Sequence, residues 1–549
     1  MIADLVTPIF YRKDYSYHDS YQIWLRMLLF YAMGGICFIL FFDYFTLTDS
    51  GRALVRGVKQ EMKDCFSEID FRSYLKPTLL LSGIYLLGIL TIIRANFLYN
   101  DDIGRAVSGN RGWFTWSRYV MQILSCVIHP DIHLTDISPL LQLLAILVLS
   151  LSSVLLIYVI GNRKVTGARL LASIPLGLSP YFLECLSYKF DAPYMALSVL
   201  ASIVPFLFIA RKKAFFFCSV AALLVMCMIY QAASGIYLLI VVMLCFQDWN
   251  SKRKTNKEIL SFLGIAGFSF CLALLFFKFL LMKPVDGYVS NGMHPVSGII
   301  SGTLKNIIEY TMLVNSDLGI IWKTGIALVL FFFITKSVCG SAQEKLLSFF
   351  VSILVICLSF ILSFGIYSLL AIPLFAPRAF LGFGVFLAIM CIYIVSDYKK
   401  RAIVAVLALN WCLFVFAFSY GNALADQKRY AEFRISILLQ DLNALFPNWG
   451  EEEDMRFQLK NSIDYAPSVK NVAKHYPIIE RLVPKQLGTD FFWNQIYWVE
   501  HFNYIQYERI NIPGISSIDF STLNLPVVLD SYYHTIQSDG NHVLVVLKH

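Results

Sequence analysis

Long apolar runs separated by short polar stretches dominate this sequence. A helix needs roughly 20 apolar residues to cross the hydrocarbon core of a membrane. Gly235–Phe246 is short for a span, so the division of Ala214–Phe246 stays open. The candidate spans are Trp24–Phe45, Pro77–Leu98, Ser138–Ile160, Leu170–Ser187, Pro193–Ala210, Ala214–Tyr230, Gly235–Phe246, Leu260–Met282, Leu318–Thr335, Leu346–Leu369, Phe380–Ser396 and Ala402–Tyr420.

Composition supports the same class. The chain has 549 residues, 58% of them hydrophobic and 15% charged, with a mean hydropathy of +0.64. A soluble protein of this size would expose too much apolar surface. We therefore predict a polytopic α-helical membrane protein with about 11–12 transmembrane helices. The net charge of +8 comes from the loops on one side, so it does not indicate nucleic-acid binding.

Basic residues gather in alternate short loops. They include Arg163/Lys164/Arg169, Arg211/Lys212/Lys213, Lys252/Arg253/Lys254/Lys257 and Lys399/Lys400/Arg401. The stretch Gly51–Lys76, with six Lys and Arg, falls on the same side. The positive-inside rule makes that side cytoplasmic, and places the loop after Leu98 and everything after Tyr420 outside.

The N-terminal part and the cysteines add little. Trp24–Phe45 either spans the membrane, with the N-terminus outside, or lies at the interface, and residues 1–23 do not resemble a cleavable signal peptide. All twelve cysteines precede residue 413 without a CxxC pair. They are interpreted as small apolar packing residues.

Three outer regions are large enough to carry function. Tyr99–Ile137 contains an amphipathic stretch, Trp113–Ile128, and Lys283–Asp317 contains a predicted helix over Leu304–Leu313. The third region, 421–549, has eleven Lys and Arg against fifteen Asp and Glu. We therefore divide the whole chain into three parts: 1–75 with one possible span, 76–420 as the transmembrane domain, and 421–549 as a small soluble α+β domain.

Two elements of the third region are predicted from its pattern. Ala423–Leu445 is predicted as a helix, and Asn524–Leu547 as two strands that turn at Ser538–Asn541. The aromatic stretch Phe491–Trp498 fits a saccharide groove and ordinary core packing equally well.

The most informative motif is Tyr99–Ser108, directly after an apolar span. Two adjacent carboxylates, Asp101 and Asp102, stand at the membrane–water boundary, and Arg105 follows one helical turn later. Adjacent carboxylates disfavour double ionisation, which can hold one of them near the pKa that a general base needs. The alternative is a solvated loop with an ordinary surface ion pair. The position at the bilayer edge favours function.

Further polar residues stand at other outer turns. Glu184, Lys189 and Asp191 form a second charged cluster, read either as part of a site or as an interfacial ion pair. Tyr230-Gln231 occupies the next outer turn, and Arg378 the one after. A guanidinium there matches a phosphate headgroup, although snorkelling to anionic lipid is equally compatible.

No metal or cofactor site is predicted. His129, Asp131 and His133 form a possible metal clip, but their spacing around Pro130 is poor. His294 is isolated, and the acidic run 451–454 is typical of a solvated surface. There is no Walker loop, dinucleotide fingerprint or GxSxG motif.

The stretch Asn100-Asp101-Asp102-Ile103-Gly104-Arg105, followed by Gly109-Asn110-Arg111-Gly112-Trp113, resembles the bacteriophage-type serotype-converting O-antigen glucosyltransferases (Gtr). The turn 180–191 is similar to a second signature of that family, and Tyr230-Gln231 and Pro377-Arg378 fit weaker ones. The resemblance covers roughly Lys76–Tyr420 and leaves out the stretch before Lys76.

The resemblance implies a GT-C-type glycosyltransferase at the periplasmic face of the bacterial inner membrane. Its donor would be an undecaprenyl-phosphate hexose, typically glucose, and its acceptor a sugar of lipid-linked O-antigen. By analogy with acidic pairs in other GT-C enzymes, Asp101 would be the general base in an inverting single displacement, positioned by Asp102 and Arg105. Lys189 and Arg378 would bind the donor phosphate.

Glu184, Asp191, Tyr230 and Gln231 are predicted to contact substrate, with membrane lipids as further partners. Acceptor specificity would vary in the tail. Two rival classes stay open: a transporter or flippase of lipid-linked sugars, which predicts charges along a path through the bilayer, and an O-antigen polymerase, which would use a different donor from the same leaflet.

Overall fold

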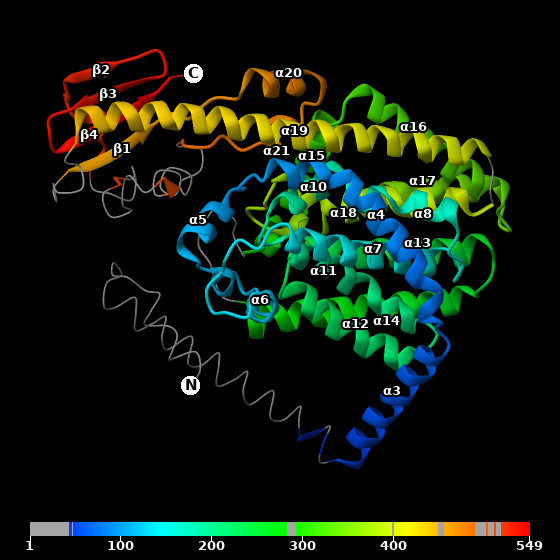
Figure 1. The fold of residues 1–549 in the computed structure, drawn as a ribbon. Helices are drawn as coiled ribbons and strands as arrows, with labels where there is room; N and C mark the ends of the chain where they lie inside the picture. The colour runs from blue at the N-terminus through cyan, green and yellow to red at the C-terminus, as the bar shows by residue number, and fades with distance from the viewer. Residues whose placement is uncertain are drawn as a thin grey trace.

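The computed structural model describes Asp43, Tyr44, Thr46 and residues 48–282, 292–397, 400–447, 455–488, 501–502, 510–511 and 518–548. Nearly all of the predicted span Trp24–Phe45 lies outside these residues, as do the acidic run 451–454 and the aromatic stretch Phe491–Trp498. The described chain forms a bundle of apolar helices with a small β-sheet beyond one end (Figure 1).

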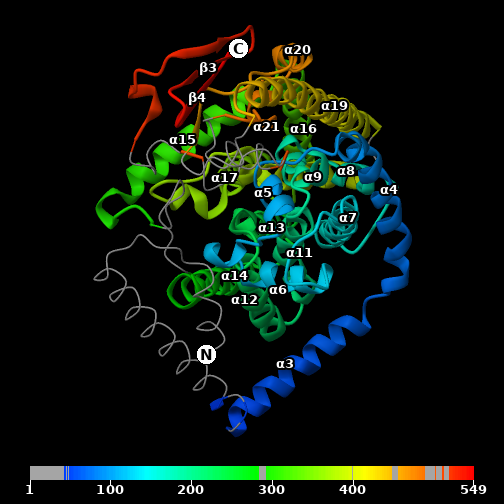
Figure 2. The same cartoon turned by 60° about the vertical axis from the view of Figure 1, so that its left-hand side comes forward.

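Several helices of the bundle are joined to the next one by short loops. α3 (Asp49–Ser67) precedes the bundle and projects from it in both views (Figure 2). The apolar helices of the bundle are α4 (Phe71–Ala95), α7 (Leu140–Ile160), α8 (Gly167–Ser173), α9 (Pro175–Leu178), α10 (Pro180–Ser187), α11 (Ala192–Ile203), α12 (Lys212–Cys227), α13 (Ser234–Asn250), α14 (Asn256–Phe276), α16 (Ile320–Cys339), α17 (Lys345–Leu362), α18 (Leu381–Ile394) and α19 (Lys400–Leu445).

Within the described residues, eight helices are long and apolar enough to cross a membrane, or nine if the bent run from α8 to α10 is one span. The predicted number is higher because α12 has only 16 residues and α11 with the 3-10 turn after it is also short. In addition, the predicted span Trp24–Phe45 lies almost wholly outside the described residues. The bend of 61° falls at Ser179, which is extended and caps α10. The predicted class, a polytopic helical membrane protein with a small C-terminal strand-containing part, is confirmed.

Several elements differ in length from their predictions. α13 continues past Phe246 because its polar last turn is satisfied: Gln247 donates to the Ile160 carbonyl at 3.1 Å and Asn250 to the Ser337 carbonyl at 3.0 Å. The amphipathic stretch after Gly112 is divided into η2 (Trp113–Trp116) and α6 (Tyr119–Ile128) by Ser117, which has a φ of 59°. α15 covers Ile299–Asp317, more than the helix predicted there.

The C-terminal part begins inside the last span. α19 runs for 46 residues without a break, so the predicted last span and the predicted tail helix are one helix, which passes along the top of the bundle in Figure 1. α20 (Pro467–His475) and α21 (Ile479–Leu482) fold back onto the bundle, where Ile479 and Leu482 join its buried core.

A four-stranded sheet packs on the far end of α19. Its order is β1-β4-β3-β2, with β1 parallel to β4 and the other pairs antiparallel. Between residues 524 and 547 it has three strands rather than the predicted two, although the predicted turn at Ser538–Asn541 is present. Its core contacts Leu438 of α19 and Ile103. The strands are β1 (Arg456–Lys460), β2 (Val527–Asp530), β3 (His534–Ser538) and β4 (His542–Leu547).

Candidate active site opposite the basic loops

The Asp-Asp motif forms a short helix between the bundle and the sheet. α5 (Asp101–Ser108) follows Asn100, whose φ of 43° turns the chain away from α4, and it ends at Gly109, whose φ is 66°. Both carboxylates lie in its first turn, where the positive end of the helix dipole favours negative charge. In the bundle, α5 holds the acidic pair at the end opposite the basic loops (Figure 1).

The two neighbouring carboxylates have different environments. The Asp101 side chain is 47% exposed and lies 3.8 Å from the Arg105 guanidinium. Asp102 is fully buried and accepts backbone N–H groups of Tyr99 at 3.1 Å, Lys189 at 2.9 Å and Phe190 at 3.4 Å. Burial raises the pKa of Asp102 to about 8, while Arg105 and the N–H groups act in the opposite direction. Asp102 thus joins α5 to the 188–191 turn, and Asp101 faces solvent.

Arg105 connects the acidic pair to the second predicted cluster. Its guanidinium donates to Asp191 at 2.6 Å and lies 4.8 Å from the centre of the Trp113 ring. The indole N–H of Trp113 donates to the other Asp191 oxygen at 2.7 Å. Gly112, with a φ of 66°, allows the turn that brings Trp113 into this position. The glycines and tryptophan of the motif therefore serve to fix Arg105.

Glu184 and Arg378 form a second ion pair. The Arg378 guanidinium donates to Glu184 at 3.0 Å, and its backbone N–H donates to the other carboxylate oxygen. The exposed fractions are 2% for Glu184 and 15% for Arg378. The Tyr99 hydroxyl oxygen lies 3.3 Å from a Glu184 carboxylate oxygen, and the Tyr188 ring centre lies 5.3 Å from the guanidinium.

Lys189 pairs with a residue that the sequence analysis missed. Its ammonium group lies 2.7 Å from a carboxylate oxygen of Asp136. The Lys189 side chain is 4% exposed and that of Asp136 is 35% exposed. The only signal in the sequence was that Asp136 stands two residues before the predicted span that starts at Ser138.

Tyr230 lies at the edge of this network. It precedes η4 (Gln231–Ala233), and the Arg118 guanidinium lies 5.3 Å from the centre of its ring. Tyr230 is 2% exposed, and its hydroxyl has no hydrogen-bond partner among the described residues. Gln231 is partly exposed. The predicted site residues thus gather at one end of the bundle, and most of the charged ones are paired with each other.

Part of the C-terminal region covers this end of the bundle. The backbone carbonyl of Leu482, at the end of α21, accepts the hydroxyls of Tyr99 at 2.7 Å and Tyr420 at 3.3 Å. Arg481 pairs with Asp317 and donates to the Phe375 carbonyl. The segment that contains α21 therefore contacts the same network as Glu184.

The possible metal clip is not assembled. The imidazole of His129 is buried beside Phe190, with neither nitrogen hydrogen-bonded to another described residue, and burial together with Arg111 lowers its pKa. The His133 side chain is 77% exposed. The described part of the chain contains no group of three His, Cys, Asp or Glu that could hold a metal ion.

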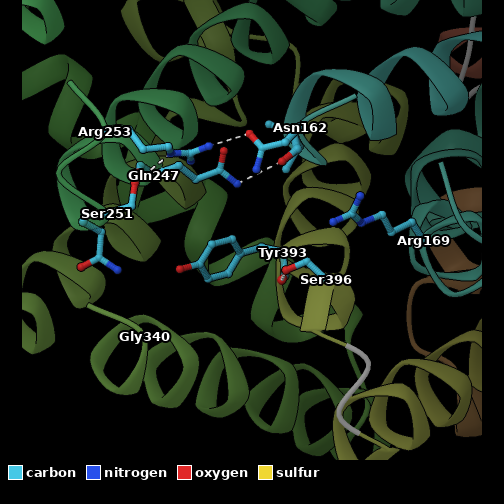
Figure 3. A pocket seen from close by; sticks show the side chains of 10 residues that line it. Asn162, Arg169, Gln247, Ser251, Arg253, Gly340, Tyr393 and Ser396 are labelled. Carbon is cyan, nitrogen blue, oxygen red and sulfur yellow. Dashed lines mark hydrogen bonds between the residues drawn. The ribbon is translucent and has the colours of Figure 1, made fainter. Parts of the chain in front are cut away.

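A separate polar cavity lies at the other end of the helices (Figure 3). Arg253 donates to Asn162 across it at 2.7 Å, and Gln247 lines its wall. These residues stand in or beside the basic loops, so this cavity is distinct from the network around Asp101.

Comparison with known proteins identifies the family. The family model "Glucosyl transferase GtrII" matches residues 90–418, which is more than half of the chain. The chain belongs to the GtrII glucosyl transferase family. This result confirms the resemblance inferred from the motifs.

This GtrII family member is also similar to a protein of Salmonella phage P22, described as an uncharacterized 55.3 kDa protein in the gtrB 5' region. The two are 22% identical over 436 residues, which cover 75% of this chain and 87% of the phage protein. No solved structure matches the chain. The matched family region contains every predicted site residue as well as Arg118 and Asp136. The C-terminal region with α21 and the sheet lies outside it.

Proposed function

We propose that this GtrII glycosyltransferase moves a hexose, expected to be glucose, from a polyprenyl-phosphate donor to lipid-linked O-antigen. The reaction takes place at the periplasmic face of the bacterial inner membrane. The observation that carries the proposal is the solvent-exposed carboxylate of Asp101, held beside Arg105 in a charged network at the outer ends of apolar helices. The basic loops at the opposite end support the orientation.

The proposed chemistry is a single displacement with inversion. Asp101 accepts the proton of the acceptor hydroxyl as that oxygen attacks the anomeric carbon. The bond from the anomeric carbon to the phosphate oxygen breaks, and polyprenyl phosphate leaves as an anion. Because this leaving group is already ionised, the reaction needs neither a general acid nor a metal ion.

The environments of the two carboxylates support Asp101 as the base. Asp102 accepts three backbone N–H groups, so its oxygens are directed toward the protein. Asp101 is exposed, and within the described chain its side chain has only the longer contact with Arg105. We therefore assign proton transfer to Asp101, and the position of α5 to Asp102 and Arg105.

The paired cations have a related role in the proposal. Arg378 and Lys189 would contribute to the donor phosphate site, because a guanidinium and an ammonium group can each stabilise the charge that develops on it. Both oxygens of Glu184 and of Asp191 are hydrogen-bonded to protein groups. We therefore assign these two carboxylates to holding Arg378 and Arg105 in place, and leave Tyr230 and Gln231 nearer the substrate.

The test is an in vitro assay of purified protein with undecaprenyl-phosphate hexoses and lipid-linked oligosaccharide, with the product linkage determined by NMR. Asp101→Asn is expected to lower turnover by roughly 10²-fold or more, the scale of a lost general base, without lowering thermal stability. Asp102→Asn is the matched comparison and is expected to destabilise the fold, because an amide cannot accept all three N–H groups.

Wild-type activity in Asp101→Asn would contradict its role as the base. Transport of lipid-linked sugar without formation of a new glycosidic bond would instead favour a flippase. Extension of O-antigen chains without a polyprenyl-phosphate monosaccharide would favour a polymerase.

A further inference from the structure

The network around Asp101 contains more acidic than basic groups. Three cations are held in ion pairs there: Arg105, Lys189 and Arg378. Five carboxylates surround them: Asp101, Asp102, Asp136, Glu184 and Asp191. An anionic ligand entering this network would meet cations whose charge is already balanced. A cation beside the network that has no carboxylate partner would therefore attract a donor phosphate more strongly than the paired Arg378 and Lys189 alone.

Arg118 is such a cation. It stands just before α6, and within the described chain it forms no ion pair. Its Nε is buried and has no hydrogen-bond partner, although its guanidinium lies 5.3 Å from the centre of the Tyr230 ring. A buried guanidinium nitrogen without an acceptor is unfavourable unless a ligand supplies one.

Tyr230 provides a second, independent observation. Its hydroxyl is buried and has no hydrogen-bond partner among the described residues. The turn η4, which Tyr230 precedes, packs against η8 (Pro377–Phe380), which carries Arg378. The Tyr230 hydroxyl and the Arg118 Nε are thus two buried donors on side chains in contact, and neither has an acceptor within the described chain.

The surroundings of Arg118 suit an anionic lipid. α6 begins at Tyr119, so the positive end of its dipole lies beside Arg118. Farther along α6, Ile123 and Val127 are 64% and 73% exposed, and this apolar surface would face lipid. The hydroxyl of Tyr119 donates to the carbonyl of Leu281 at 2.7 Å. This bond fixes α6 against the π-helical turn Phe277–Leu281 that follows α14.

We propose that Arg118 and Tyr230 form the subsite that holds the phosphate of the lipid donor, close to the turn η8 that carries Arg378. The inference rests on the proposed function, because it assumes a polyprenyl-phosphate donor. Arg118 pairs with two phosphate oxygens, as the planar guanidinium allows, and the Tyr230 hydroxyl donates to one of them. The C–O bond to the sugar is then oriented toward Asp101 and the acceptor.

The experiment measures binding of undecaprenyl phosphate, the leaving group, to the full-length protein in detergent. Arg118→Ala is expected to weaken binding roughly 10- to 100-fold, the range for losing a hydrogen bond between charged groups. Arg118→Lys should recover it only in part, and Tyr230→Phe should weaken it several-fold. In the assay, the donor KM should rise while the acceptor KM stays constant. Arg429→Ala, which removes a guanidinium that is 74% exposed on α19, is the matched control.

The outcomes separate this subsite from the proposed function. If the wild-type protein does not bind undecaprenyl phosphate, the proposed donor class is wrong. If it binds and both Arg118→Ala and Tyr230→Phe bind equally well, the donor class stands and the subsite is wrong. An equal loss of phosphatidylglycerol binding from mixed micelles would show a general contact with anionic lipid and would also overturn the subsite. Tyr230→Phe removes a single oxygen, so it keeps the test valid if Arg118→Ala does not fold.

Discussion

Glu184 and Arg378 are buried together, so neither can be tested alone. Arg378→Ala would leave a carboxylate that is 2% exposed without its cation, and breaking a buried pair in this way costs about 3–5 kcal/mol. We expect the double variant Arg378→Ala/Glu184→Gln to regain most of the thermal stability lost in Arg378→Ala, because no buried charge remains unpaired. We also expect its donor KM to stay raised. Thermal unfolding and donor titration of the same preparations measure the two effects.

Arg378→Lys is the control for that prediction. It keeps the charge and loses the planar fork, so it should restore stability better than donor binding. A normal donor KM in the stable double variant would mean that Arg378 has a structural role only.

At the scale of single residues, the sequence predicted which residues form the site, but it did not predict which of them pair with each other. Charged side chains at the ends of apolar spans are costly and therefore informative, which singled out Asp101, Glu184 and Arg378. Their partners come from distant parts of the chain: Arg105 and Asp191 are 86 residues apart, and Glu184 and Arg378 are 194 apart. Without those contacts, the sequence could not tell which carboxylate of the acidic pair faces solvent.

Helix contacts in the bundle depend on small residues at close approaches. At Gly421 in α19, an added Cβ would lie 2.6 Å from the backbone carbonyl carbon of Thr91 in α4. Because that neighbour is backbone, the two helices would have to separate. Gly421→Ala is expected to lower the free energy of unfolding by about 1–3 kcal/mol, measured as a lower Tm in one detergent.

Gly325→Ala in α16 is the matched control for this element. There the added Cβ would lie 3.7 Å from a Leu409 methyl group, which is an ordinary contact, so stability should be unchanged or slightly higher. A Tm for Gly421→Ala equal to that of Gly325→Ala would contradict the close approach of α4 and α19.

At the scale of elements, periodicity located the long helices well and their ends less well. The apolar run after Lys400 predicted a span that ended at Tyr420, because polar residues follow. The structure continues α19 to Leu445, since the later turns bury Ile435, Leu438 and Leu442 against the sheet. Two of the four strands were not predicted: β2, which is only four residues long and mostly exposed, and β1, which has five residues and lies far from the other strands in the chain.

Over the whole molecule, the C-terminal region makes two kinds of contact. Its first part, through α20 and α21, joins the core of the bundle, and the Leu482 carbonyl receives hydroxyls from the site network. Its second part, the sheet, contacts α5 through Ile103. The first part therefore contacts Tyr99, two residues before Asp101, and the second contacts the helix that carries Asp101. A saccharide acceptor that approaches Asp101 from the aqueous side would pass this region.

The last prediction follows from that arrangement. Residues 446–549, exchanged between relatives of different serotype at a junction after Leu445, should change which lipid-linked oligosaccharide is modified. The donor KM should stay constant, because Arg118, Tyr230 and Arg378 lie in the matched family region. Competition between two acceptors in one reaction, with products separated by mass, measures the change. A chimera that folds, binds undecaprenyl phosphate normally and keeps the acceptor preference of its transmembrane part would contradict the prediction. A reporter fused after His549 that is active only in the cytoplasm would contradict it at an earlier step, because the C-terminal region and the acceptor would then lie on opposite sides of the membrane.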